Sequence, residues 1–201
     1  MRRFAIALAA LVTCSGTALA YDAASQDVID RFKPGKLVPI EAVGSLMLGA
    51  ERWCYDQRGE ECGWSDIYLE IDGDTVRYEL SNPWSAAIDI SFVAEGVFRD
   101  GRYICDTGFD WVPSVRAYER PDGQAIEGRE LDALKQEIAA HIDTSQAGDC
   151  FDYLYLGHDE EAQTITLTQR QYVDGTHQPA RDAEVTLHFD EAKADNLGWY
   201  W

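Results

Sequence analysis

A pair of carboxylates beside an aromatic residue is the feature of this sequence closest to a catalytic set. Asp106 and Asp110 lie close together in the chain, and Trp111 follows the second of them. Glycosidases need two carboxylates at a fixed separation, and Trp111 would give a sugar ring a flat surface. The chain has 36 acidic residues, so neighbouring carboxylates are also expected on an ordinary solvated surface. Asp106 and Asp110 are therefore weak catalytic candidates, and an envelope glycan hydrolase using such an Asp/Glu pair is an alternative to the main hypothesis.

Established motifs for catalysis and cofactor binding are missing from the sequence. There is no Gly-x-Ser-x-Gly, no His-Glu-x-x-His, no phosphate-binding glycine loop and no dinucleotide fingerprint. Asp106-Thr107-Gly108 matches the tripeptide of aspartic proteases, but the bulky Phe109 follows it and a three-residue match is weak evidence. The four histidines have no short ligand spacing. We therefore predict no metal and no cofactor, and in the main hypothesis a binding protein rather than an enzyme.

Two of the six tryptophans lie in loop-like sequence and are the candidate binding residues. Trp84 occurs within Ser81-Asn82-Pro83-Trp84-Ser85, and Trp111 is followed closely by Pro113. Tryptophan commonly fills the core of a β-rich fold, but it is also enriched at binding surfaces. Trp84 and Trp111 are therefore the residues that we expect to contact a ligand or a partner.

The cysteines predict two disulfides. An even number of cysteines follows Cys14, and in an exported chain such a set indicates bridges. Three connectivities are possible. The favoured one joins Cys54 to Cys62, which flank a turn-like segment, and Cys105 to Cys150. These bridges would leave no thiol nucleophile in the mature chain.

The first 20 residues have the features of a secretory signal peptide. Met1-Arg2-Arg3 is positive, Phe4 to Val12 is apolar, and Ala18-Leu19-Ala20 is a small-x-small cleavage site. We expect cleavage after Ala20 and a periplasmic or secreted protein. Lipidation at Cys14 is the alternative, although the residue before that cysteine fits poorly. No later segment approaches the roughly 18 apolar residues of a membrane-spanning helix.

The net charge restricts the class of partner. The chain has 17 Lys and Arg against 36 Asp and Glu, a formal charge of −19. Loss of the signal peptide would remove two arginines and no acid, giving −21. Nucleic-acid binding needs a basic face, so we predict no nucleic-acid partner. An acidic surface attracts basic partners. We therefore expect the binding partner to be either a basic envelope protein or peptide, or a small ligand. The sequence leads to no prediction of the oligomeric state.

Alternating apolar residues predict a mainly antiparallel β fold. Ile67, Leu69 and Ile71 are expected to share one buried face, as are Val185 and Leu187 near the end of the chain. Asp-Gly, a favoured hairpin turn, occurs four times between such runs, at Asp72-Gly73, Asp100-Gly101, Asp122-Gly123 and Asp174-Gly175. We predict about nine strands, at 45–55, 66–71, 75–80, 87–98, 102–106, 112–120, 151–156, 163–173 and 183–189.

One long segment has a helical period instead. Apolar residues between Arg129 and Ile142 recur at steps of three and four, which predicts an amphipathic helix, and Ser25 to Phe32 predicts a shorter one. The expected architecture over 21–201 is one disulfide-stabilised β-rich α+β domain, a barrel or sandwich with the helix packed on it. The aromatic end, Leu197 to Trp201, also suggests a small outer-membrane barrel, but several runs are shorter than the about 9–11 residues of a spanning strand.

Overall fold

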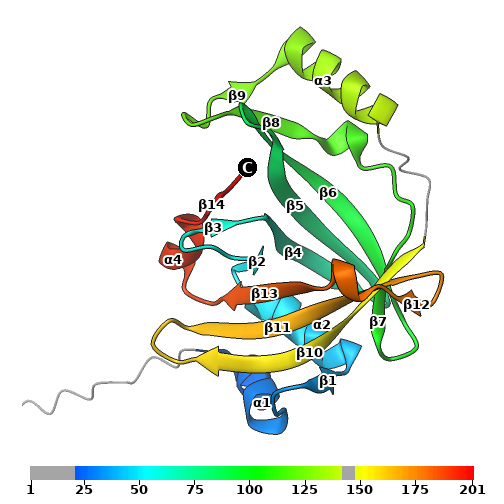
Figure 1. Ribbon diagram of the computed structural model, residues 1–201, viewed down its shortest axis with the longest axis vertical. Coiled ribbons are helices and arrows are strands. Elements are labelled where there is room, and N and C mark those ends of the chain that lie inside the picture. Colours follow the sequence, from blue (N-terminus) through cyan, green and yellow to red (C-terminus); the bar gives the residue numbers. More distant parts are fainter. Residues whose placement is uncertain (1–20, 142–147) are drawn as a thin grey trace, which may run out of the picture.

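The computed structural model describes residues 21–141 and 148–201. The predicted signal peptide, the alternative lipidation site Cys14 and the predicted helix end at Ile142 lie outside the described residues. Within them, the fold is mainly β, with a large antiparallel sheet that wraps into a ring (Figure 1). This confirms the predicted fold class.

The ring closes because one short strand pairs on both sides. Neighbouring strands follow the order β10-β11-β13-β2-β4-β5-β6, and β7 then pairs with both β6 and β10. The members are β2 (Arg52–Tyr55), β4 (Trp64–Asp72), β5 (Thr75–Ser85), β6 (Ile88–Arg99), β7 (Tyr103–Asp106), β10 (Asp149–Asp159), β11 (Thr164–Val173) and β13 (Ala183–His188).

The other strands extend the ring. β1 (Lys36–Val38) pairs with β10, β12 (Thr176–His177) with β11, and β8 (Arg116–Glu119) with the first half of β6. β9 (Ala125–Ile126) pairs with β8. β3 (Glu61–Cys62) and β14 (Gly198–Trp199) form a separate parallel pair.

The helices cover different parts of the ring (Figure 1). α1 (Ala23–Arg31) and α2 (Ile40–Gly49) pack against each other and share a core with the ring's inward residues. α3 (Gly128–His141) packs near η1 (Val112–Ser114), where β8 and β9 lie. α4 (Glu191–Asp195) and η2 (Pro179–Arg181) flank β13. The predicted helices at 25–32 and 129–142 correspond to α1 and α3.

Local sequence explains most of the strand boundaries. Each of the four Asp-Gly pairs connects adjacent antiparallel strands, and all four glycines have positive φ. The inward residues of β11 and β13 alternate with half-exposed threonines, as the period of two requires. These turn and strand predictions are confirmed.

Two predicted strands were wrong in part. The 45–55 prediction fails at its start, where residues through Gly49 belong to α2. Ile40, Val43 and Met47 have helical spacing. However, α2 is buried on most of its surface, so its sequence lacks the clear division into apolar and polar faces that marks a surface helix. The 112–120 prediction fails at η1, because Pro113 favours the first turn of a helix and has no N–H for a ladder.

The predicted common face of Ile67, Leu69 and Ile71 was also wrong. A bulge between Tyr68 and Glu70 shifts the register of β4 against β5. Before the bulge, Tyr68 pairs with Tyr78 and its side chain is buried in the core. Leu69 is half exposed, and only Ile71 packs on the core. An extra residue exchanges the two faces of a strand, so strict alternation fails across it.

The disulfides join the cysteines as the spacing favours, Cys54 to Cys62 and Cys105 to Cys150. Two bridges indicate an oxidising compartment, extracellular or periplasmic. In the described ranges, no helix has the length and apolar character needed to cross a membrane.

Candidate functional site

A chamber of about 270 Å³ lies inside the ring. Most of its wall is formed by inward side chains of six ring strands. These side chains do not fill the interior of the ring completely, and the chamber is the space that they leave. The lining residues are Tyr55, Trp64, Asp66, Tyr68, Tyr78, Leu80, Ile104, Asp106, Phe151, Tyr153, Gln169, Gln171 and Arg181. The chamber is therefore bounded mainly by aromatic rings, with a few polar groups among them.

Asp66 is the unusual group in this wall. It is 5% exposed, and its Oδ2 accepts a hydrogen bond of 2.9 Å from the hydroxyl of Tyr55. Its other oxygen, Oδ1, is buried and has no hydrogen-bond partner among residues 21–141 and 148–201. Burial raises the pKa of Asp66 to about 7, the Tyr55 hydrogen bond opposes the rise, and the charge of Asp106 adds to it. Buried polar atoms are nearly always paired in native proteins, so the unpaired Oδ1 of Asp66 is an unusual feature of this wall.

Asp106 lies in the same chamber. Burial raises its pKa to about 6, and the charge of Asp149 adds to the rise. Asp110, in contrast, is exposed and does not line the chamber. Its Oδ1 accepts from the backbone N–H of Val112 at 3.3 Å, at the start of η1. The structure therefore separates the two candidate carboxylates and places Asp106 with Asp66, which the sequence analysis had not selected.

The tyrosines of the chamber are held by one another and by a glutamine. Tyr55 stacks on Trp64, with ring centroids 4.7 Å apart and planes 10° apart. Gln169 donates to the hydroxyl of Tyr153 at 3.0 Å. Burial raises the pKa of Tyr55, Tyr68, Tyr78 and Tyr153, so these phenols stay protonated at physiological pH. The chamber thus offers neutral hydroxyls and fixed ring faces around its two carboxylates.

Trp84 and Trp111, the predicted binding residues, line one apolar cleft of about 470 Å³. Trp111 stacks on Phe92 with centroids 3.9 Å apart. Trp84 comes from the end of β5, and Trp111 directly precedes η1. The other lining residues are Gly63, Trp64, Leu80, Asn82, Pro83, Ile90, Tyr200 and Trp201. The structure therefore brings together two residues that are distant in sequence.

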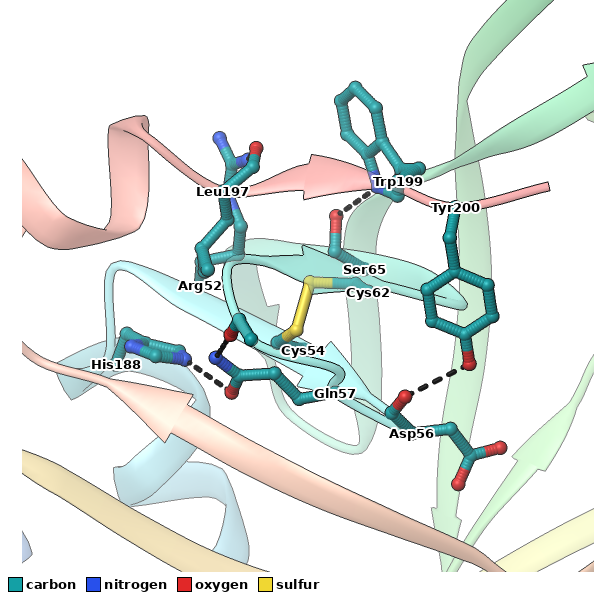
Figure 2. Close-up of a disulfide and its surroundings, with 11 residues drawn as sticks. Arg52, Cys54, Asp56, Gln57, Cys62, Ser65, His188, Leu197, Trp199 and Tyr200 are labelled. Carbon is teal, nitrogen blue, oxygen red and sulfur yellow. Dashed lines mark hydrogen bonds between the residues drawn. A yellow bond between two sulfur atoms is a disulfide. The ribbon is translucent and has the colours of Figure 1, made fainter.

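The 197–201 segment supplies one wall of this cleft and is attached to the Cys54–Cys62 loop (Figure 2). The N–H groups of Gly198 and Tyr200 donate to Glu60 and Cys62 carbonyls at 2.9 and 3.1 Å. Trp199 Nε1 donates to the Ser65 hydroxyl at 3.1 Å, and the Tyr200 hydroxyl donates to the Asp56 carbonyl at 2.9 Å. The disulfide loop therefore holds Tyr200 and Trp201 at the cleft.

Removing this disulfide should loosen that wall. The double variant Cys54→Ala/Cys62→Ala opens a loop with a sequence separation of 8, for which the chain-entropy model gives a loss of about 2–3 kcal/mol in the free energy of unfolding. Amide hydrogen exchange at Gly198 and Tyr200 should become faster than at the amides of β11. Unchanged exchange at these two positions would show that side-chain packing alone holds the segment.

A larger depression, of about 630 Å³, lies away from the chamber and involves α2 and two hairpin turns. Its charged lining residues, Glu41, Asp74, Arg99 and Asp100, are all exposed. None of its described lining side chains has a buried polar atom without a partner, so it is a weaker candidate site despite its size. Within residues 21–141 and 148–201, no group of three or more His, Cys, Asp or Glu side chains is arranged to hold a metal ion.

Comparison with known proteins gives no further guide. No family model matches the chain, and no curated protein matches it in sequence.

Proposed function

We propose that the chain is an exported, non-enzymatic protein that binds a small molecule in its chamber. Export is supported by the signal-like first 20 residues and the two disulfides. Binding is supported by one observation above all: Asp66 lines the chamber, and its buried Oδ1 has no hydrogen-bond partner among the described residues. Ligand sites are typically cavities with a few polar groups in a mainly apolar wall, and perturbed pKa values gather at functional sites.

Blocking the chamber should remove a ligand that the native protein carries. Leu80 is half buried and lines both the chamber and the cleft, so Leu80→Trp places its extra atoms in open space at their junction. We expect native mass spectrometry of protein purified without detergent from its own compartment to show a small-molecule adduct. The adduct should be absent from Leu80→Trp and present in the matched surface variant Leu48→Trp, whose site is exposed on α2.

Circular dichroism of both variants would confirm that they are folded. A wild-type protein free of adducts, whose melting temperature is also unchanged by the dialysable fraction of the same compartment, would contradict the proposal. A co-purifying basic protein in place of a small molecule would instead support the partner suggested by the net charge.

One observation favours a glycan hydrolase as the second candidate. Asp66 and Asp106 line the same chamber, and the pKa of Asp66 is raised to about 7 against about 6 for Asp106, so Asp66 is the more readily protonated of the two, as a general acid must be. Release of reducing ends from envelope glycan by the wild type, lost in both Asp66→Asn and Asp106→Asn but kept in Asp110→Asn, would support the hydrolase. No release by the wild type would exclude it.

A further inference from the structure

We infer that the ligand is an amphipathic organic cation, with an ammonium-type head in the chamber beside Asp66 and an aromatic or aliphatic tail in the cleft lined by Trp84 and Trp111. The inference rests on the proposed function and specifies the chemical class of its ligand. It depends on three features of the described residues, namely the continuity of the two spaces, the charge of the chamber and the apolar character of the cleft.

The chamber and the cleft adjoin. Trp64 and Leu80 line both of them. On β5, Tyr78 lines the chamber, Leu80 lines both spaces, and Asn82 and Trp84 line the cleft. Because alternate residues of a strand point to the same side, Tyr78, Leu80 and Asn82 form one continuous surface from the chamber to the cleft, and Trp84 follows at the irregular pairing of β5 with β6 between Pro83 and Ser85. One elongated ligand can therefore occupy both.

The charge of the chamber calls for a cation. Asp66 and Asp106 are its two carboxylates, and Asp66 Oδ1 has no donor among the described residues. Arg181 is the one basic residue of the described lining, and it is exposed on η2. A buried carboxylate is stable in its ionised form only when it is paired. A ligand ammonium would pair with Asp66 and would also lie near the aromatic rings of Tyr68 and Tyr78, which attract cations.

The cleft selects the rest of the molecule. Its lining side chains are mostly aromatic or aliphatic, and Asn82 is the one amide among them. An inorganic cation would gain nothing from such a surface, whereas burial of a hydrocarbon tail contributes roughly 25 cal/mol per Å². A head and a tail on one molecule would therefore use both spaces.

Dansylcadaverine is a suitable probe, because it joins a primary ammonium to a fluorescent aromatic ring through a five-carbon chain. Its N-acetyl derivative is the neutral match, and dansyl-aminohexanoic acid is the acidic match. We expect the amine to bind with a blue shift of dansyl emission, and to bind at least about 10-fold more tightly than either match, since a charge-assisted hydrogen bond is worth about 1.5–3 kcal/mol.

Variants of the protein should distinguish the contribution of the ammonium head to binding from that of the tail. Asp66→Asn should weaken binding of the amine by at least about 10-fold and leave the N-acetyl probe unchanged. Trp84→Ala should weaken both by a similar factor of about 10. Asp110→Asn, the matched exposed carboxylate, should change neither. Equal loss of both probes in Asp66→Asn would show that this residue acts only through structure, and would overturn the inference.

The wild type provides a test that does not depend on the folding of a variant. With an Asp66 pKa of about 7, the dissociation constant of the amine should rise about 30-fold from about pH 8.5 to about pH 5.5, and that of the N-acetyl probe should stay constant. Protonation of Asp106 acts in the same direction. The other titratable groups that line the chamber are Arg181 and four tyrosines, Tyr55, Tyr68, Tyr78 and Tyr153. Burial raises the pKa of all four phenols, so they stay neutral over this range.

The outcomes separate this inference from the proposed function. If the neutral or the acidic probe bound more tightly than the amine, the cationic class would be overturned and the small-molecule site kept. The same conclusion would follow if none of the three probes bound while native mass spectrometry showed an adduct that Leu80→Trp loses. The absence of both probe binding and adduct would overturn both.

Discussion

Replacing Asp66 with asparagine is expected to stabilise the ligand-free protein at about pH 8. The carboxyl has a pKa of about 7 in the folded chain, against 3.8 as its ordinary value. The folded state therefore holds this proton more tightly than the unfolded state, so stability falls as pH rises from about 4 to about 7. A difference of about 3 pKa units corresponds to a penalty of up to about 4 kcal/mol. Asparagine carries no charge and keeps an oxygen that can accept from Tyr55, so it should escape most of this penalty.

Urea unfolding at a series of pH values would measure the effect. The wild type should lose stability from about pH 4 to about pH 7 relative to Asp66→Asn. Asp106→Asn should show a smaller gain, because its pKa is raised only to about 6. Asp110→Asn should follow the wild type. A variant that is more stable but no longer binds the amine probe is the expected signature of a functional group kept at the expense of stability. A less stable Asp66→Asn at pH 8 would indicate a structural role.

Features set by local chemistry could be predicted from the sequence. The Asp-Gly turns fix where strands reverse, because both residues tolerate positive φ and few others do. The turns also set the register of the hairpins, so the strands predicted at 87–98 and 102–106 match β6 and β7 to within one residue at each end, whereas the strand predicted at 75–80 ends too early, since β5 continues to Ser85. The pairing of Cys54 with Cys62 followed from their short separation around a turn.

Features set by tertiary packing could not be predicted. α2 is mostly covered by α1 and the ring, so its polar face is reduced to Glu41 and Ser45, which is too little to mark a helix in the sequence. The bulge in β4 has no sequence signature, yet it decides which side chains of that strand are buried inward. Asp66 was therefore placed at the start of a predicted strand and not in a site. Its isolation among aromatic residues is visible only when β2, β5 and β10 surround it.

The candidate binding residues show an intermediate case. Trp84 and Trp111 were selected singly from their loop-like context, and the structure brings both to one cleft because β6 connects their two regions. A proline close to each tryptophan predicted a loop, which is correct for Trp111 at the start of η1, whereas Trp84 lies within β5, where its pairing with β6 is irregular. That the cleft continues into a chamber depends on the ring, and no local pattern contains that information.

Removing the disulfide that closes the ring is the second change from which we expect a large effect on stability. Among the described residues, β7 meets β10 through two residue pairs, Cys105 with Cys150 and Ile104 with Phe151, and the disulfide lies on this seam. Its sequence separation is 45, so Cys105→Ala/Cys150→Ala should lower the free energy of unfolding by about 4 kcal/mol in the chain-entropy model. This exceeds the loss expected for the Cys54–Cys62 bridge, because the longer loop leaves more freedom in the unfolded chain.

The seam variant should also weaken ligand binding, because Ile104, Asp106 and Phe151 line the chamber on the two sides of the seam. One contact should survive: Arg102, just before β7, pairs with the fully buried Asp152 of β10, with Nε 2.7 Å from Oδ2. We therefore expect a folded but less stable protein, with faster amide exchange at the β7–β10 pairs than in β11 and β13. Urea unfolding of the seam variant and of the Cys54→Ala/Cys62→Ala variant would compare their free energies of unfolding. If the seam variant were the more stable of the two, packing and the Arg102–Asp152 pair, rather than the disulfide, would close the ring.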